Sequence, residues 1–577
     1  MSLSTEERGL QELRTVRAQS RSLYWTVAIF SFFVNLLMLT GPLYMLQVYD
    51  RVLGSGSQET LFALSLLVVF LFALMGLIDF ARGRLMARVG ARFQDALDHR
   101  VFDASLRRSA LGQSSTSETA LQDLEAVQRL LTSPVLTAVF DMPWAPVFIL
   151  GIALFHPWLG MLAIVGGAAL ILAAVLNQLA TRRHSERMLA ITHNANRMSA
   201  QMQTEAELVS ALGMREAAFD RWKSVRRTSL EETMATADVG GGFTTGIKTF
   251  RLFLQSAMLG LGAFLVLKGE LTPGAMIAGS ILLGRALAPV ELAVNQWAVV
   301  QRARKGWQNL AELLGTVPPV QPRTELPVPE AKLQLQQVTI VPPGEAQATL
   351  RMMSFDVVPG EAIGVIGSSG AGKSTLAKAI TGVWRPAGGK IRLDGASLEQ
   401  YDPVALGRYI GYLPQRVELF DGTIAENIAR LQKDAPAEKI IAAAKKADAH
   451  DMILKLPDGY ETQVSVHGGR LSGGQLQRIG LARAVYEDPV ILVLDEPNSN
   501  LDNEGSLALN TAIRAMKKAG KSVLIMAHRP AAIQECDKLL MVEHGQKRAF
   551  GPKDEVLKEV LRNHEQVRNS QGPGGVQ

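Results

Sequence analysis

Long runs without a charged residue distinguish the first half of the chain from the second. Residues 22–49, 60–78 and 142–181 contain no Asp, Glu, Lys or Arg over 28, 19 and 40 positions. A helix needs about 20 mainly apolar residues to cross a bilayer, and an ionised side chain at the bilayer centre costs roughly 3 kcal/mol. The three runs therefore predict membrane-spanning helices.

Two further features raise the predicted number of spans to six. The run 142–181 is interrupted by His156–Gly160 (HPWLG), which predicts two spans joined by a tight hairpin. Residues 252–267 are uncharged, and residues 271–292 are apolar except for Arg285 and one Glu. Beyond residue 302 no uncharged run exceeds 12 positions, so no span is expected there.

The segments between the spans differ in basic residues, which predicts an orientation. Residues 1–22, 81–135 and 180–244 carry four, eight and nine Arg and Lys residues, whereas residues 50–59 and 268–273 carry one each. Segments rich in Lys and Arg stay on the cytoplasmic side of a membrane. The N-terminus and both long segments are therefore predicted to be cytoplasmic.

The polar segments of the first half also show helical patterns. Ala91–Arg108 and Glu205–Arg227 have apolar positions three and four apart, which predicts helices that project beyond the membrane. Residues 5–20 carry a thin apolar stripe, for which an interfacial helix and a frayed amphipathic terminus are equally good interpretations. The first apolar run is too long for a signal peptide and is expected to stay in the membrane.

Composition narrows the class of protein without naming a partner. The chain is 47% hydrophobic and 20% charged, with a net charge of +6 from 60 basic and 54 acidic residues. These values exclude a disordered chain and give no sign of nucleic-acid binding. Cys536 is the only cysteine, which excludes an intrachain disulfide and a Cys-based metal site and fits a reducing compartment.

A phosphate-binding motif follows a short strand predicted over Ala362–Ile366. The motif has the form G-x-x-x-x-G-K-S and consists of Gly367, Ser368, Ser369, Gly370, Ala371, Gly372, Lys373 and Ser374, with Thr375 next. Small residues let backbone N–H groups and a helix N-terminus face the phosphates of a nucleotide. Lys373 is expected to reach the β- and γ-phosphates, and Ser374 to ligate Mg²⁺.

A second apolar strand, Pro489–Pro497 (PVILVLDEP), ends in Asp495 and Glu496. The carboxyl ends of buried parallel strands lie at the ligand crevice of an α/β domain. Asp495 is therefore expected to hold Mg²⁺, and Glu496 to orient and polarise the attacking water. Such a pair after a strand is by itself an ordinary loop start, and its combination with the phosphate loop makes it a catalytic candidate.

The segment Leu471–Gln475 (LSGGQ) lies directly before a predicted helix. Together with the phosphate loop and the strand that ends in Asp-Glu, it resembles the signature set of ATP-binding cassette (ABC) ATPases. The resemblance implies ATP and Mg²⁺ as cofactors, and contacts from Ser472, Gly473, Gly474 and Gln475 to the nucleotide held by a partner subunit.

The same resemblance implies roles for three single residues. Gln415 matches the residue that contacts Mg²⁺ and relays to the membrane domain. Asp502 matches the loop that crosses the dimer, and His528 matches the histidine at the γ-phosphate. The implied catalytic residues are then Glu496, His528 and Lys373, and the implied metal ligands are Ser374, Gln415 and Asp495.

Two positions depart from the ABC exporter pattern. Leu333–Gly344 contains no aromatic residue, although the family places one there against adenine. Val466 stands where exporters often have a glutamate. We therefore expect an altered adenine contact and altered contacts from the segment around Val466 to the cytoplasmic loops.

One phosphate loop and one signature per chain mean that two chains are needed for two complete sites, so we expect a homodimer.

The predicted fold class is an α-helical membrane domain of six spans, of the ABC exporter type, plus an α/β P-loop ABC ATPase domain. Five prolines in residues 315–330 predict a linker between them. The predicted organisation is an N-terminal cytoplasmic or interfacial segment over 1–22, the transmembrane domain over 23–314, the linker, a nucleotide-binding domain over 331–565 and a flexible tail over 566–577.

Several stretches carry a closer resemblance, to type I secretion ATPases of the alkaline-protease (PrtD) type. They are Pro42–Ser57 (PLYMLQVYDRVLGSGS), Phe140–Phe148 (FDMPWAPVF), His156–Gly160, Gly284–Pro289 (GRALAP) and Asp495–Asp502 (DEPNSNLD). The resemblance covers nearly the whole chain. It implies an ATP-driven exporter in the bacterial inner membrane that moves unfolded proteins with a C-terminal signal, such as proteases, lipases and RTX-like proteins. The implied partners are a periplasmic adaptor and a TolC-like outer-membrane channel.

Other interpretations stay open. A lipid or multidrug exporter shares every ATPase motif and the six-span layout. The spans oppose a soluble, non-transporting ABC ATPase, and Glu496 opposes an inactive scaffold. Arg285 either lines the translocation path or pairs with an acid near the cytoplasmic end of its span. Ser114–Gln122 and Leu208–Arg215 are expected to dock on the ATPase domain.

Overall fold

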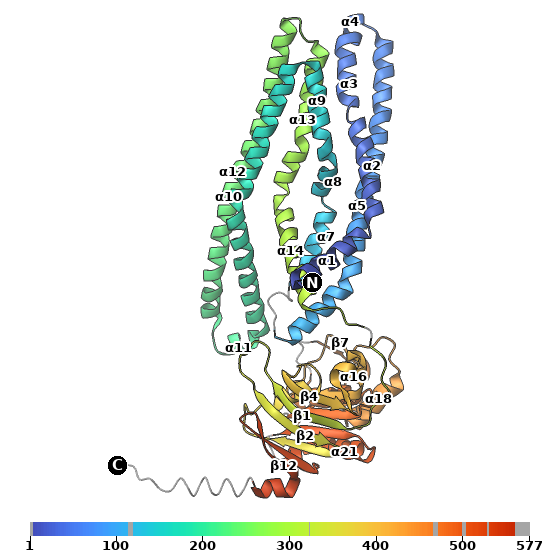
Figure 1. The fold of residues 1–577 in the computed structure, drawn as a ribbon, viewed down its shortest axis with the longest axis vertical. Coiled ribbons are helices and arrows are strands. Elements are labelled where there is room, and N and C mark those ends of the chain that lie inside the picture. Colours follow the sequence, from blue (N-terminus) through green and yellow to red (C-terminus); the bar gives the residue numbers. More distant parts are fainter. Residues whose placement is uncertain are drawn as a thin grey trace, which may run out of the picture. The chain divides into compact units, whose positions relative to one another are not determined.

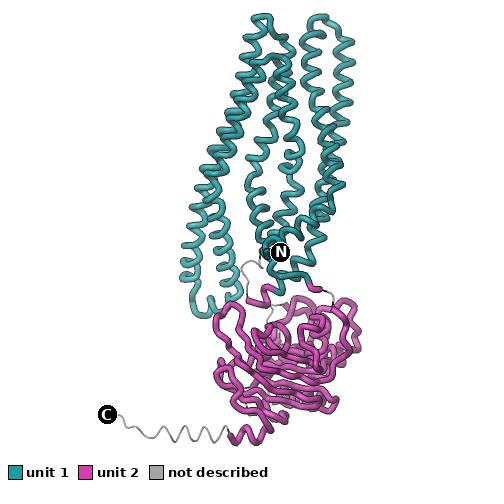
Figure 2. Tube along the Cα trace, in the orientation of Figure 1, with its two compact units in different colours: residues 1–107, 114–319 teal, residues 108–113, 320–577 magenta. Residues whose placement is uncertain are grey.

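The computed structural model describes residues 4–112, 119–321, 323–465, 471–498, 503–527 and 530–559. It contains two compact units, one of residues 1–107 and 114–319 and one of residues 108–113 and 320–577 (Figure 2). The boundary between Pro319 and Val320 falls inside the proline-rich stretch 315–330. The remaining domain bounds stay predictions.

All the secondary structure described in unit 1 is helical (Figure 1). Its helices are α1 (Thr5–Ala18), α2 (Arg21–Leu37), α3 (Thr40–Gln47), α4 (Leu53–Ser55), α5 (Gln58–Ala110), α7 (Ala120–Leu131), α8 (Pro134–Asp141), α9 (Ala145–Phe155), α10 (Pro157–Thr204), α11 (Ala206–Ala211), α12 (Arg215–Leu267), α13 (Pro273–Asn295) and α14 (Trp297–Thr316), with a π-helical turn η1 (Val48–Val52) and a 3₁₀ turn η2 (Met142–Trp144).

Six helical segments are long and apolar enough to cross a membrane, which confirms the predicted number. They are Arg21–Ser55, Gln58–Ala110, Pro134–Phe155, Pro157–Thr204, Arg215–Leu267 and Pro273–Asn295. The third span begins at Pro134, earlier than the predicted residue 142. The helical segment thus extends past the start of the uncharged run and includes Asp141, whose charge is paired with Arg82.

The predicted hairpin between the third and fourth spans is confirmed at His156. This residue is extended (φ −161°, ψ 134°), and its Nδ1 accepts a hydrogen bond from the Trp158 N–H at 3.2 Å. Pro157 occupies the first turn of α10, where its missing N–H costs no helical hydrogen bond. One residue therefore ends α9 and caps α10.

Helices α10 and α12 lie side by side (Figure 1). At 1.5 Å per residue, the 53 residues of α12 extend about 80 Å, whereas the hydrocarbon core of a bilayer is about 30 Å thick. Both helices therefore continue well beyond the membrane. In this part His184 Nδ1 and a carboxylate oxygen of Glu232 lie 2.8 Å apart and join them.

The two helices predicted beyond the membrane have different outcomes. Ala91–Arg108 lies within α5, as predicted, but a continuous helix over Glu205–Arg227 is wrong. Helix α11 ends at Ala211, Gly213 has φ +65°, and α12 begins at Arg215. Glycine adopts the left-handed conformation at no steric cost and commonly ends helices, so the chain reverses direction here.

Residues 5–20 contain a regular, capped helix, α1, so the interpretation as a frayed terminus is wrong, while an interfacial position stays a prediction. Leu13 is 0% exposed, and Glu12 pairs with Arg100 of α5 at 2.9 Å. A Cβ on Gly9 would lie 1.9 Å from the carbonyl oxygen of Ala311 in α14. The thin apolar stripe is thus a contact face for α5 and α14, two helices distant in sequence.

Charged residues of the membrane spans are paired across helices. Arg82 of α5, 7% exposed, contacts Asp141 at the end of α8 at 2.8 Å. Arg251 of α12 contacts Glu291 of α13 at 3.2 Å. Such pairs lower the cost of placing ions in an apolar environment and fix which helices are neighbours.

Unit 2 contains an antiparallel sheet of order β2-β1-β4-β5, a larger sheet of order β12-β11-β3-β10-β9-β6, and the short pair β7-β8. The strands are β1 (Leu333–Ile340), β2 (Leu350–Val357), β3 (Ala362–Ile366), β4 (Gly388–Leu393), β5 (Ala396–Ser397), β6 (Ile410–Leu413), β7 (Gly422–Thr423), β8 (Gln463–Val464), β9 (Ile491–Asp495), β10 (Ser522–Ala527), β11 (Lys538–Glu543) and β12 (Gln546–Pro552). In the larger sheet only the β11–β12 pair is antiparallel, which confirms the α/β class.

Helices cover the larger sheet of unit 2. They are α15 (Lys373–Ile380), α16 (Pro403–Tyr409), α17 (Ile424–Ile428), α18 (Ala437–Lys446), α19 (His450–Leu454), α20 (Gly473–Val485) and α21 (Asn503–Lys518), with 3₁₀ turns η3 (Leu398–Gln400), η4 (Gly459–Glu461) and η5 (Pro530–Ile533). Every residue of β9 and β10 is buried. Burial on both faces explains why these strands are continuous apolar runs rather than alternating ones.

Gly9→Ala is expected to destabilise unit 1, because the added Cβ would meet a backbone carbonyl and separate α1 from α14. Overpacking of this kind costs about 1–3 kcal/mol, so the unfolding temperature of the detergent-solubilised chain should fall. Gly76→Ala in α5 is the matched control, since a Cβ there meets nothing within 4 Å. Equal unfolding temperatures for Gly9→Ala and wild type would contradict the packing of α1.

Candidate nucleotide-binding site

Four parallel strands bring most of the predicted site residues to one edge of the larger sheet. The phosphate loop follows β3, Asp495 and Glu496 end β9, and Gln415 follows β6. The sheet order β3-β10-β9-β6 makes these strands neighbours, and parallel strands have their carboxyl ends at the same edge. The local pairing of strands therefore assembles residues that lie far apart in sequence.

Two glycines of the phosphate loop are required by its backbone. Gly372 has φ +104° and is the residue directly before α15. A Cβ on Gly367 would lie 2.3 Å from the carbonyl oxygen of Val542, so no other residue fits there without displacing β11. The loop thus holds the N-terminus of α15 close to the sheet, where its free N–H groups and dipole favour an anion.

Lys373 points into the phosphate loop. Its ammonium donates hydrogen bonds to the carbonyl oxygens of Gly367 at 3.0 Å and Ser368 at 2.9 Å, and the residue is 5% exposed. Burial lowers the pKa of Lys373, and the nearby carboxylates of Glu496 and Asp495 oppose this shift. Its contact with nucleotide phosphates stays a prediction.

Ser374 and Asp495 meet at the N-terminus of α15. The Ser374 hydroxyl donates to a carboxylate oxygen of Asp495 at 3.2 Å, and Asp495 is 2% exposed. Burial raises the pKa of Asp495, and the hydrogen bond from Ser374 works against that rise. A hydroxyl and a carboxylate beside a phosphate-binding loop are the oxygen ligands that Mg²⁺ prefers, so these residues fit the predicted metal.

Glu496 has an unusual backbone conformation that the surroundings hold in place. Its φ is +50°, a left-handed value that costs a residue other than glycine roughly 1–3 kcal/mol. Its N–H donates to the carbonyl oxygen of Met526 in β10 at 3.0 Å. The Gln415 side-chain amide donates to its carboxylate at 2.9 Å. Strain kept by several contacts is common at catalytic positions.

The signature residues occupy the start of a helix rather than the end of a strand. Ser472 is the N-cap of α20, and its hydroxyl accepts from the Gln475 N–H at 3.3 Å while the Gln475 side chain accepts from the Ser472 N–H at 2.8 Å. Gly473 and Gly474 form the first turn. This reciprocal cap keeps the helix N-terminus open toward an anion.

Two predicted site residues, Asp502 and His528, lie outside the described residues, and so does Val466. The strand before His528, β10, lies between β3 and β9. The predicted roles of all site residues, including the contact of Gln415 with Mg²⁺, stay predictions.

Three residues that contact the elements of the site were missed by the sequence analysis. Burial and the nearby Asp495 raise the pKa of Tyr412 to about 12, so this phenol stays neutral beside the carboxylate. Arg430 donates to the carbonyl oxygens of Gly407, Arg483 and Ala484 at 2.6, 3.0 and 2.9 Å. Gln477 is a buried amide inside α20. Only Gln477 carried a signal, as a polar residue among the buried apolar positions of its helix.

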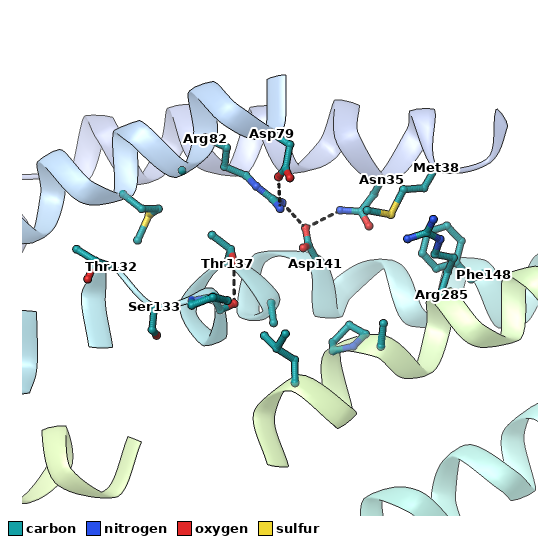
Figure 3. A pocket seen from close by; sticks show the side chains of 17 residues that line it. Asn35, Met38, Asp79, Arg82, Thr132, Ser133, Thr137, Asp141, Phe148 and Arg285 are labelled. Carbon is teal, nitrogen blue, oxygen red and sulfur yellow. Dashed lines mark hydrogen bonds and ion pairs between the residues drawn. The ribbon is translucent and has the colours of Figure 1, made fainter. Parts of the chain in front are cut away.

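The membrane unit contains a polar cavity of about 410 Å³ (Figure 3). Asp141 lies at its wall and accepts hydrogen bonds from Arg82 at 2.8 Å and Asn35 at 2.7 Å, while Arg82 also contacts Asp79 at 2.7 Å. Arg285 of α13 lines the same cavity. The cavity therefore combines both signs of charge with apolar residues of several spans.

The pairing expected as one alternative for Arg285 is not seen. Within the described part of the chain no ion pair to Arg285 is found, and the acid of its own helix, Glu291, contacts Arg251 instead. Arg285 is exposed in the isolated chain. The acid partner of one alternative is therefore not seen, and the place of Arg285 on the translocation path stays a prediction.

Comparison with known proteins identifies both units. Residues 350–499 match the family model for "ABC transporter", and residues 24–288 match that for "ABC transporter transmembrane region". The type I secretion system ATP-binding protein PrsD of Rhizobium meliloti is 43% identical over 551 residues, 95% of each chain. The leukotoxin translocation ATP-binding protein LktB of Mannheimia haemolytica is 27% identical over 96% of this chain and 77% of its own length.

A solved structure supports the fold. A bacterial Atm1-family ABC exporter with ATP bound has a TM-score of 0.75 and 22% sequence identity, covering 96% of this chain and 99% of its own. The likeness to PrsD extends through the membrane half, which confirms the resemblance predicted from sequence. The chain therefore belongs to the ABC transporter family, with the ATP-binding proteins of type I secretion systems, and is a multi-pass membrane ATPase.

Proposed function

We propose that this chain is the inner-membrane exporter of a type I secretion system, which uses ATP to move unfolded proteins with a C-terminal signal out of the cell. The observation that carries the proposal is the 43% identity to PrsD across 95% of the chain, since it includes the membrane half where exporters of different cargo differ most. The proposed partners are a periplasmic adaptor and a TolC-like outer-membrane channel.

In the proposed ATPase reaction the phosphates of ATP lie at the N-terminus of α15. The loop N–H groups and the Lys373 ammonium bind the β- and γ-phosphates and favour the charge that develops during transfer. Mg²⁺, held by Ser374, Asp495 and Gln415, would supply further neutralisation of that charge. Glu496 orients the attacking water, and the hydrogen bond from Gln415 fixes the direction of its carboxylate.

The two ATP sites are proposed to be shared between two copies of the chain. The sequence contains one phosphate loop and one signature, and the cap at Ser472 presents a helix N-terminus that can bind a second phosphate group. In a homodimer the signature of each chain, Ser472–Gln475, would complete the site of the other. Asp502 and His528 are proposed to act at the same interface.

The N-terminus and the long polar segments are proposed to lie in the cytoplasm, as the excess of basic residues predicts. The polar cavity beside Arg285 is proposed to belong to the path of the exported chain. An unfolded polypeptide carries charges and backbone polar groups, so its path through apolar helices must offer polar partners.

Deletion of the gene for this chain should remove one or a few large proteins from the culture medium, as measured by mass spectrometry. Reintroduction of the wild-type gene should restore them, and reintroduction of Glu496→Gln should not. An unchanged medium together with altered lipid composition or drug sensitivity would contradict protein export and favour a lipid or multidrug exporter.

Glu496→Gln should retain ATP binding and lose hydrolysis by about 100-fold or more, because general-base contributions are typically 10²–10⁴. Radiolabelled ATP retention and phosphate release by the purified protein measure the two effects. Glu543→Gln, an exposed carboxylate at the end of β11, is the control and should hydrolyse ATP normally. Unchanged turnover in Glu496→Gln would refute the assignment of this residue.

Arg285→Ala should reduce export at least several-fold while basal ATPase activity stays near wild type, because among the described residues no ion pair holds this side chain. Export is measured in the culture medium and ATPase activity on purified protein. Arg285→Lys should retain export. Arg82→Ala is the contrasting control, since it leaves the Asp141 carboxylate without its cation and should cost about 3–5 kcal/mol of stability. Loss of folding in Arg285→Ala would contradict the proposed position on the path.

A further inference from the structure

Gln477 forms a buried hydrogen bond between the signature helix and the loop that carries Glu496. The residue lies in α20, is 2% exposed, and its side-chain amide donates to the carbonyl oxygen of Pro497 at 3.1 Å. Its neighbours Ile479 and Leu481 belong to the apolar core. A buried amide among apolar residues is stable only when its hydrogen bonds are made, so this contact defines where α20 sits against the loop.

The Pro497 carbonyl completes the set of contacts that hold the Glu496 loop. On one side of the loop the Glu496 N–H is bonded to Met526 of β10, and on the other the Pro497 carbonyl is bonded to Gln477. Between them the backbone of Glu496 has φ +50°. A left-handed residue relaxes unless both flanks are fixed, so Gln477 contributes to the position of the Glu496 carboxylate.

Helix α20 is well suited to transmit a displacement. The reciprocal cap of Ser472 and Gln475 keeps its first turn regular, and Gln477 begins the second turn. At its other end Arg430 binds the carbonyl oxygens of Arg483 and Ala484. A regular helix of this length moves as one body, so a phosphate that binds at Ser472 also shifts Gln477.

We propose that Gln477 is a positioning residue that couples the two ATP sites of the dimer. The inference rests on the proposed function, in which Glu496 acts on the ATP of its own phosphate loop while Ser472 of the same chain contacts the ATP of the partner. The hydrogen bond from Gln477 to Pro497 then connects occupancy of the second site to the orientation of Glu496 at the first.

Mixed dimers of two differently tagged copies test this coupling. In each dimer one copy is the live chain, and its partner is either Glu496→Gln, which holds ATP without hydrolysis, or Lys373→Ala, which binds ATP poorly. With Gln477 in the live chain, hydrolysis at saturating ATP should be several-fold faster with the Glu496→Gln partner. With Gln477→Met in the live chain, hydrolysis should fall at least tenfold and become independent of the partner.

Methionine is the appropriate replacement because it nearly keeps the volume of the buried side chain and removes the amide that donates to Pro497. The same Gln477→Met substitution placed in the Glu496→Gln partner should leave the live chain nearly unaffected, because the live Glu496 keeps its own contact. If Gln477 acted only on the structure of its own signature, the result would be reversed. Gln477→Met in the partner would then slow the live chain, since the partner's signature completes the live site, and Gln477→Met in the live chain would not.

Asn427→Leu is the control for general destabilisation. Asn427 is 0% exposed and donates to the carbonyl oxygens of Phe420 at 2.9 Å and Thr423 at 3.0 Å, in a helix that packs on α20. Its replacement should lower the unfolding temperature and leave the dependence on the partner intact. Loss of partner dependence in Asn427→Leu would overturn the specific role of Gln477.

The remaining outcomes are also decisive. Equal rates with both partners when the live chain is wild type, or a partner dependence that survives Gln477→Met, would overturn the coupling. Ser472→Arg placed in the Glu496→Gln partner should abolish hydrolysis by the live chain. Continued hydrolysis there would instead contradict the shared sites of the proposed function, whatever the result for Gln477.

Discussion

The parallel pairing of β3, β10, β9 and β6 is the constraint on which the ATP site depends. Parallel strands have their carboxyl ends at the same edge of the sheet. The Ser374 hydroxyl and the Asp495 carboxylate, 121 positions apart in sequence, therefore lie 3.2 Å apart. The same edge explains why the site tolerates a strained Glu496. Neighbouring strands supply the Met526 carbonyl and, after β6, the Gln415 amide, which hold the residue where an isolated loop would relax.

The arrangement of helices in the membrane unit depends on a second constraint: a lipid environment offers no partner for a charge. The ions of the spans are therefore satisfied by other helices, as in Arg82 with Asp141 and Arg251 with Glu291. These pairs determine which helices are neighbours. Apolar side chains determine this less well, because they contact lipid as favourably as they contact another helix. Arg285 departs from this pattern, and a departure of this kind is the usual mark of a functional position in a membrane protein.

The sequence was most informative where one local feature decides the outcome. Uncharged runs predicted the six spans, a proline-containing turn predicted the hairpin at His156, and the glycine-rich motif predicted the phosphate loop between β3 and α15. It failed where distant residues decide. The helix of the third span includes Asp141, which is paired with Arg82, and α1 packs closely on α14 at Ala311 and Gly315. In both cases the contacting residues lie far away in sequence, so the local pattern does not indicate them.

By itself, the sequence determined the chemistry of this protein: a membrane half, an ATPase half, and the residues Lys373, Ser374, Asp495 and Glu496 as the candidates that act on phosphate. Motifs of this kind can be recognised in a sequence because few other residues can replace glycine, lysine or a carboxylate at a phosphate-binding site. Only the tertiary structure decided how these residues are held. The contact of Gln477 with Pro497 and the three carbonyls bound by Arg430 depend on backbone groups that folding brings together. Every residue has a backbone carbonyl, so the sequence does not indicate which of them will be the partner.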